Sequence, residues 1–85
     1  MAVAIKICGL TTLETLDVAL EAGADMVGFV FFPQSPRHIT LDQARHLGAA
    51  VQGRAIKVAL SVDADDEQLS AMTEVLVPDM LQLHG

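Results

Sequence analysis

The chain has 85 residues, of which 52% are hydrophobic, and a formal net charge of −6, so it forms at most one small domain or part of a larger one. Its five basic residues are scattered and it has no Trp or Tyr, so we expect no nucleic-acid partner. Its one cysteine excludes an internal disulfide, and no apolar run is long enough for a signal peptide or a membrane span, so we expect a cytoplasmic protein without a membrane partner.

The chain begins with a predicted strand and helix. Residues 3–8, VAIKIC, are short, apolar and β-branched, which is typical of a buried strand. Residues 11–23 have the apolar period of a helix, with Thr11 and Glu14 spaced as a capping box and Gly23 at the end. The side chains expected to face the core are Leu13, Leu16, Ala19 and Leu20.

A second strand and helix follow. Residues 24–31, ADMVGFVF, predict another buried strand, and residues 32–39, which contain two prolines, predict a loop. Thr40 and Gln43 have capping-box spacing at the start of a helix over residues 41–51. Its core-facing residues are expected to be Leu41, Ala44, Leu47 and Val51.

The pattern then repeats a third time and ends on a strand. Residues 55–62 predict a strand, and residues 63–76 predict a helix in which Asp65 and Gln68 form the capping box. Residues 80–85, MLQLHG, predict the fourth strand. The apolar stripe of this third helix is Leu69, Met72, Val75 and Leu76.

The resulting order, βαβαβαβ with very apolar strands, predicts a parallel sheet covered by helices. We expect residues 1–85 to be a single incomplete domain, namely the first four strands and three helices of a (βα)8 TIM barrel with the helices outside. The alternative is a small doubly wound, flavodoxin-like domain. Because an isolated four-stranded sheet exposes two apolar edges, we also expect this part to self-associate or to need the missing C-terminal half.

Alternation along the strands assigns side chains to the two faces of the sheet. Lys6 and Cys8 share one face, as do Gln82 and His84. In the third strand the set Val58, Leu60 and Val62 opposes the set Ala59, Ser61 and Asp63. We expect the large aliphatic residues to face the helices, which places the polar and small ones on the barrel interior.

Chemically useful side chains collect at the carboxyl ends of the predicted strands. Cys8, Asp63 and His84 end their strands, while Arg37 and His38 lie in the loop after the second. Parallel-sheet enzymes of both architectures place their active sites at this rim. The sequence therefore predicts one shared pocket there.

Each of these residues also has a plain structural interpretation. A lone cysteine in an apolar run is commonly inert, although Lys6 on the same face and a helix that begins soon after Gly9 both favour a thiolate at Cys8. Arg37 is either a solvated loop residue or a bidentate grip for a carboxylate or phosphate. His38 is expected to make local hydrogen bonds, and Gln82 and His84 belong either to the core or to the pocket.

The acidic run DADDE, residues 63–67, is not expected to bind a metal. It lacks the glycine and distal glutamate of a calcium loop. Helix capping and the helix dipole account for most of its charge. No glycine-rich phosphate-binding fingerprint is present in the sequence either.

Four motifs, KICGLT, GFVFFPQSPRHI, VALSVDADD and LQLHG, together resemble the phosphoribosylanthranilate isomerase family of tryptophan biosynthesis, in the family's order. The resemblance implies a (βα)8 barrel that converts N-(5′-phosphoribosyl)anthranilate, a small phosphorylated substrate, into 1-(o-carboxyphenylamino)-1-deoxyribulose 5-phosphate. This reaction is an Amadori rearrangement, an aldose–ketose isomerisation. The family uses no cofactor and no metal.

The resemblance also implies roles for individual residues. Cys8 would be the general base that removes the C2′ proton, and Arg37 would bind the anthranilate carboxylate. Gln82 and His84 would bind substrate from the fourth strand. Ser61 stands where the family pattern leads us to expect phenylalanine, which would loosen a pocket wall. Asp63 matches the third-strand motif and is not assigned as the general acid.

The family's general acid and phosphate-binding loops belong to later strands, so this chain alone is expected to be inactive. One alternative is a non-catalytic half-barrel module that self-associates through its open sheet edges. Another is a different phosphate-handling barrel of tryptophan or histidine biosynthesis. The cysteine of KICG favours the isomerase over that second alternative, because those relatives use carboxylates or lysines.

Overall fold

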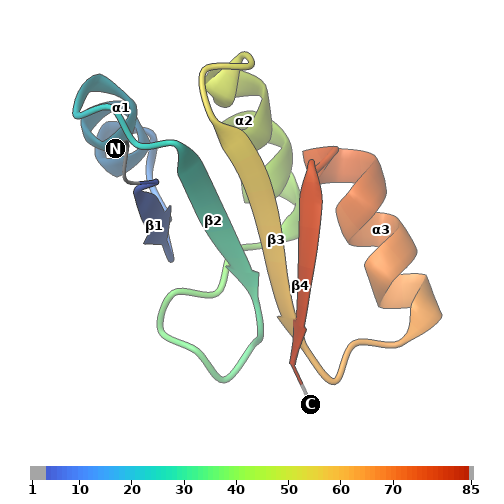
Figure 1. The fold of residues 1–85 in the computed structure, drawn as a ribbon. Coiled ribbons are helices and arrows are strands. Elements are labelled where there is room, and N and C mark those ends of the chain that lie inside the picture. Colours follow the sequence, from blue (N-terminus) through green and yellow to red (C-terminus); the bar gives the residue numbers. More distant parts are fainter. Residues whose placement is uncertain (1–3, 85) are drawn as a thin grey trace.

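The computed structural model describes residues 4–84, and the side chain of His84 lies outside the described part. Four strands alternate with three helices, as the sequence predicted (Figure 1). In chain order the elements are β1 (Lys6–Cys8), α1 (Leu13–Glu21), β2 (Met26–Phe31), α2 (Leu41–Val51), β3 (Ile56–Val62), α3 (Asp66–Leu76) and β4 (Met80–His84).

The strands form one sheet in which every pair of neighbours is parallel and the order is β1-β2-β3-β4. Each strand therefore pairs with the next one in the sequence, and each helix is the crossover between two adjacent strands. A doubly wound sheet would instead reverse its strand order at a switch point. The sheet order thus confirms the predicted arc of a (βα)8 barrel.

All three helices cover the same face of the sheet, as Figure 1 shows. Leu16 of α1, Leu47 of α2 and Leu76 of α3 all belong to one buried cluster with Val27 and Phe29 of β2. The opposite face of the sheet carries no helix in the described part of the chain. We call this the open face, and it corresponds to the interior side of a barrel.

The face assignment of the third strand was wrong. Ala59 pairs with Phe29 and Ser61 pairs with Phe31 across the β2–β3 ladder, so these small residues lie on the helix-covered face. Both are almost completely buried. A large residue in β2 therefore faces a small one in β3, which lets the layer fill without overlap. The larger aliphatic residues Val58, Leu60 and Val62 lie on the open face instead.

Two of the three predicted helix caps are confirmed. Gln43 N donates to Thr40 Oγ1 at 3.1 Å, and Thr40 N donates to Gln43 Oε1 at 2.8 Å. Asp65 and Gln68 make the equivalent pair of bonds, at 2.8 and 3.0 Å. These reciprocal bonds satisfy backbone groups that the first turn of a helix leaves unpaired.

The start of α1 differs from the prediction. Its N-cap is Thr12, not Thr11, and the Thr12 hydroxyl accepts from Thr15 N at 3.1 Å. Leu13 and Leu41, both expected in the core, are 50% and 44% exposed. Each is the first residue of its helix, so its side chain lies at the helix end rather than over the sheet.

Two aspartates fix the amino-terminal ends of the strands, a feature that the sequence analysis missed. Asp25 Oδ2 accepts from Ile5 N at 2.7 Å, while Asp25 N donates to Ile5 O at 2.9 Å. Asp79 makes the same two bonds to Lys57, at 2.8 and 2.9 Å. The β1–β2 and β3–β4 pairs therefore begin with the same clamp, far from the carboxyl ends where the site residues lie.

Candidate active site

The carboxyl ends of the strands meet at one rim, where the sequence predicted the pocket. Cys8 pairs with Gly28, Gly28 with Val58, and Val58 with Met80, so these four residues form one row across the open face. Residues two positions away share that face because side chains alternate along a strand. Lys6, Val30 and Gln82 are among them.

Cys8 is the last residue of β1, and its thiol is free and exposed. The chain turns sharply after it, because Gly9 has a φ of +80°, a conformation that glycine adopts without steric cost. Gly9 N and Leu10 N both donate to Gly28 O, at 3.0 and 3.3 Å. The end of β1 is thus held against β2, and the thiol is presented at the rim rather than buried in the core.

Gly28 leaves the room that this thiol occupies. A β-carbon built at position 28 would lie 2.7 Å from Cys8 Sγ and 3.3 Å from Cys8 Cα. Real β-carbons do not approach a sulfur so closely, so any larger residue at position 28 would push the thiol aside. No role was predicted for Gly28 from the sequence, and this contact was missed.

Arg37 comes back over the residue that follows Cys8. The loop after β2 turns at Ser35, where Ser35 N donates to Phe32 O at 2.9 Å and Ser35 Oγ accepts from Arg37 N at 3.1 Å. This turn lays the arginine stem across Gly9, whose missing side chain would overlap Arg37 Cδ and lie 3.2 Å from Nε. The structure thus brings together Cys8 and Arg37, two residues that the sequence predicted separately.

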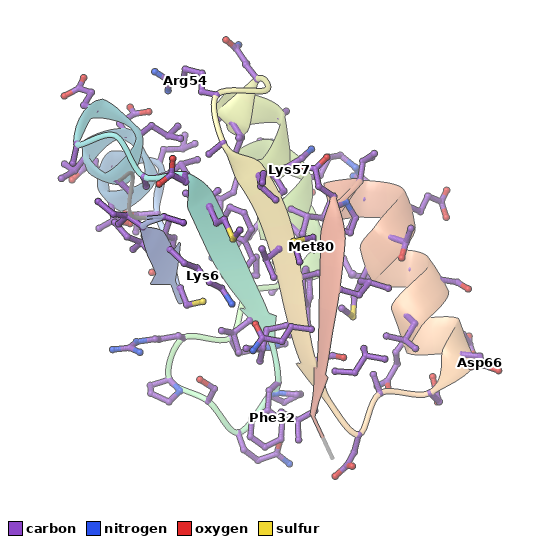
Figure 2. All side chains as sticks on the ribbon, in the orientation of Figure 1. Lys6, Phe32, Arg54, Lys57, Asp66 and Met80 are labelled. Atoms are coloured by element: carbon purple, nitrogen blue, oxygen red, sulfur yellow. The ribbon has the colours of Figure 1, made fainter. Side chains whose placement is uncertain are left out.

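Lys6 and Gln82 meet on the open face, although they belong to the two edge strands. The Lys6 ammonium donates a hydrogen bond to Gln82 Oε1, and Figure 2 shows the lysine side chain lying along the face that the helices leave open. Alternation predicted that both residues lie on this face. It gave no sign that they touch.

His38, Asp63 and His84 are the other residues that the sequence placed near the rim. His38 N donates to Ser35 O at 3.1 Å, which is a local hydrogen bond of the kind expected, while the ring atom Nδ1 is buried and has no hydrogen-bond partner among the described residues. Asp63 follows β3 with a φ of +51° and is exposed. His84 pairs with Val62 through the backbone, and its side chain is outside the described residues.

Ser61 does not line the pocket. It lies on the helix-covered face, is 1% exposed, and its hydroxyl has no partner within the described part of the chain. The expectation that it would loosen a pocket wall was therefore wrong. A serine at position 61 therefore affects the packing between the sheet and the helices, not the binding of substrate.

Neither a metal centre nor a membrane-spanning helix is found in residues 4–84. No three of their His, Cys, Asp and Glu side chains gather in a group that could hold a metal ion. In the acidic run 63–67, Asp65 caps α3, as the sequence analysis expected of this run. None of the helices described here has the length and apolar character needed to cross a bilayer.

The charge on the open face is opposite in sign to that of the whole chain. Its strand positions carry Lys6 and a row of apolar or neutral residues, without a carboxylate among those described. Arg37 adds a second cation at the rim. The ion pairs of the described residues, Arg45–Asp42 and Arg54–Asp17, involve neither of these cations. A face of this kind, cationic and open, is suited to a ligand with negative groups.

Comparison with known proteins points to one family. The profile described as N-(5′-phosphoribosyl)anthranilate (PRA) isomerase matches residues 5–85. The N-(5′-phosphoribosyl)anthranilate isomerase of Nitrobacter winogradskyi is 67% identical over the whole chain, and that of Bradyrhizobium sp. (strain ORS 278) is 65% identical. The chain spans 38% and 39% of the length of these two relatives.

Solved structures agree with the sequence relatives. Phosphoribosylanthranilate isomerase from Thermotoga maritima superimposes with a TM-score of 0.92 at 36% identity, covering 99% of this chain and 41% of the other. A phosphoribosylanthranilate isomerase in complex with reduced 1-(o-carboxyphenylamino)-1-deoxyribulose 5-phosphate gives a TM-score of 0.93 at 36% identity, with 99% and 43% covered. The described fold is therefore similar to somewhat under half of these structures.

Proposed function

The chain belongs to the N-(5′-phosphoribosyl)anthranilate isomerase family, and from this premise we propose that it supplies the base and part of the substrate site for that isomerisation in the complete protein. The substrate would be N-(5′-phosphoribosyl)anthranilate and the product 1-(o-carboxyphenylamino)-1-deoxyribulose 5-phosphate, in a step of tryptophan biosynthesis. The observation that carries the proposal is the free thiol of Cys8 at the carboxyl end of β1, with Arg37 lying across the adjacent Gly9.

Cys8 would act as the general base. Opening of the ribose ring gives a protonated Schiff base between the anthranilate nitrogen and C1′, which makes the C2′ proton acidic. The thiolate takes this proton, and the C2′–H electrons form a C1′=C2′ double bond while the nitrogen regains its lone pair. The resulting enolamine then gains a proton at C1′ and loses one from the C2′ hydroxyl, which leaves the ketone. An exposed thiol can carry out the first transfer because a thiolate can accept a proton and this one is open to substrate.

Arg37 would bind the anthranilate carboxylate. A guanidinium donates two parallel hydrogen bonds to a carboxylate, which fixes the orientation of the aromatic ring as well as adding affinity. Its place over Gly9 brings the guanidinium near the base, as the substrate requires, because only the aromatic ring, the amine nitrogen and C1′ separate the carboxylate from C2′. The exposed guanidinium has no ion-pair partner among the described residues.

The remaining chemistry would come from the part of the protein that this chain does not include. The relatives are more than twice as long as the matched segment. We propose that the general acid and the phosphate-binding groups lie in that additional part, as in many barrels whose phosphate site follows the last strands. Residues 1–85 alone would then lack turnover.

The test is an isomerase assay on the complete protein with Cys8→Ala. General acid–base groups contribute roughly 10²–10⁴-fold to rate, so turnover should fall by that factor while substrate still binds. Ser61→Ala is the matched control, since it removes one side-chain heteroatom from a strand of the same sheet on the other face, and it should leave turnover unchanged. Near-normal turnover in Cys8→Ala would exclude this base.

A further inference from the structure

We infer that Lys6 is a substrate-contacting residue, whose ammonium donates a hydrogen bond to the oxygen on C2′, and that Gln82 is the positioning residue that orients it. This inference rests on the proposed isomerase function. It changes the role that the family resemblance implied for Gln82, from direct substrate binding to support of a lysine that had been considered only as a neighbour of the thiol.

Lys6 lies on the same face of the sheet as the thiol of Cys8. Lys6 and Cys8 are two residues apart in β1, where they pair with Met26 and Gly28 of β2. Both therefore lie on the open face, on the side of the sheet where substrate must bind if Cys8 is the base. Gly28, which pairs with Cys8, has no side chain that could cover the thiol.

The Lys6 side chain is directed toward the rim at the carboxyl ends of the strands. Met80 lies in the same row as Cys8, and Gln82 is two residues further toward the carboxyl end of β4. Because the Lys6 ammonium reaches Gln82 Oε1, it lies on the rim side of the sheet although its α-carbon precedes Cys8. Figure 2 shows the labelled side chain extending along the sheet in that direction. The positive charge of Lys6 therefore lies as close to the rim as the thiol of Cys8 does.

The Lys6 ammonium is not neutralised by a carboxylate among the described residues. The hydrogen-bond partner of Lys6 is a neutral amide oxygen, and the ion pairs of residues 4–84 do not include this lysine. The strand positions that surround it are mostly apolar, as in Met26 and Val58. An ammonium that is oriented but not neutralised can give its remaining N–H groups to an oxygen of the ligand, and such charge-assisted bonds are the stronger kind.

A cation bonded to the oxygen on C2′ would assist the reaction at that carbon. When the thiolate removes the C2′ proton, the substituent on that carbon changes from a hydroxyl to an enol and then to a ketone. A cation that donates to this oxygen withdraws electron density from C2′ during proton removal and stabilises the oxygen as its own proton leaves. Lys6 donates a hydrogen bond and transfers no proton, so the proton balance of the reaction is unchanged. Interactions that strengthen as charge develops are those that accelerate a reaction.

The experiment is a thermodynamic cycle that compares the affinities of the complete protein, as wild type and as variants, for two ligands. One is reduced 1-(o-carboxyphenylamino)-1-deoxyribulose 5-phosphate, which carries a hydroxyl at C2′, and the other is the same compound without that hydroxyl. Wild-type protein should bind the first more tightly by roughly 10- to 100-fold, which is the range for a hydrogen bond to a charged group. Lys6→Met should bind the two ligands within about twofold of each other, because a cycle isolates the contact between one residue and one ligand group.

Two further variants separate the roles of the residues. Gln82→Leu should keep part of the preference for the hydroxyl, because Lys6 is still present but no longer oriented. Lys57→Met is the matched control: it removes a lysine whose ammonium is bonded to Leu76 O on the helix-covered face, so the preference should match wild type. Lys6→Gln, compared by circular dichroism and thermal midpoint, provides a second variant if Lys6→Met does not fold.

The inference is overturned if wild type shows no preference between the ligands, or if Lys6→Met keeps it. A preference lost in Gln82→Leu but retained in Lys6→Met would show that Gln82 itself binds the oxygen. Failure of the proposed function has a different signature. A complete protein that shows the hydroxyl preference but does not turn over substrate, or a fully active Cys8→Ala, would contradict the isomerase mechanism and leave the Lys6 contact standing.

Discussion

Gly28 and Cys8 are in direct contact across the β1–β2 ladder, so closely that a β-carbon at position 28 would lie 2.7 Å from the sulfur. Gly28→Ala should therefore displace the thiol while leaving its chemistry intact. A displacement of about 1 Å at a reacting group can lower turnover about 10²-fold, so a steady-state assay of the complete protein should show a loss of that order in kcat.

Gly48→Ala is the control for this substitution. Gly48 is also buried and crowded, since its added carbon would lie 2.9 Å from Leu76 Cδ1, but it sits in α2 on the helix-covered face. Gly48→Ala should change the free energy of unfolding and leave kcat unchanged. Equal losses of turnover in both variants would mean that a new side chain at any crowded, buried glycine lowers turnover. The contact between Gly28 and Cys8 would then not be the cause.

Arg37→Ala should weaken binding of reduced 1-(o-carboxyphenylamino)-1-deoxyribulose 5-phosphate by roughly 10- to 100-fold, the range for a charged hydrogen-bonding group. Arg37→Lys should recover only part of the loss because an ammonium cannot form the two parallel bonds of a guanidinium. Titration calorimetry measures both. Arg45→Ala, which removes an exposed arginine paired with Asp42 at 3.7 Å, should have no effect. Unchanged affinity in Arg37→Ala would make Arg37 a loop residue without a role in binding.

Ser61→Ala should stabilise the complete protein without changing its activity. The Ser61 hydroxyl is buried among helix-facing side chains and lacks a partner among the described residues. An unsatisfied buried polar group costs about 1–3 kcal/mol, so its removal should raise the free energy of unfolding by an amount within or below that range. Denaturant unfolding followed by circular dichroism measures the change. A destabilised Ser61→Ala protein would indicate that the hydroxyl has a partner in the rest of the chain.

Residues 1–85 expressed alone should self-associate or be partly molten, and they should not turn over substrate. Leu81 and Leu83 of the edge strand β4 are 45% and 61% exposed, and at the other edge Val18 of α1 is 66% exposed. Unpaired strand edges with apolar side chains favour association. Sedimentation velocity and an isomerase assay test this together. A compact, cooperatively unfolding monomer with turnover would contradict both the association and the incomplete site.

Sequence pattern predicted the order and type of every element because apolar period and cap spacing are local properties. It failed where the answer depends on neighbours. Val58 is buried on the open face just as Ala59 is buried on the helix-covered face, so burial does not require the large residues of β3 to face the helices. Ala59 is small because Phe29 lies beside it. Spacing also cannot distinguish Thr11 from Thr12, because the first helical residue depends on how the loop from Gly9 enters the helix.

The sequence predicted that Cys8 and Arg37 lie at one rim, but it did not predict the contacts that they make. The strand ends located Cys8 and Arg37, since parallel strands bring their carboxyl ends to one rim. The glycine that accommodates the thiol and the bond between Lys6 and Gln82 could not be predicted, because they depend on register between strands that are up to 76 residues apart. Only the ladder pairing fixes that register.

The sequential order of the strands has a consequence for synthesis on the ribosome. Each strand pairs with the one made just before it, so a new βα unit of about 20–30 residues finds its docking surface already present when it emerges. At about 5–20 residues per second, one unit takes seconds to appear, whereas helices and short loops form in about a microsecond or less. The growing chain can therefore pair strand by strand from its amino terminus, and the β1–β2 ladder that carries Cys8 can form before Gln82 has been translated.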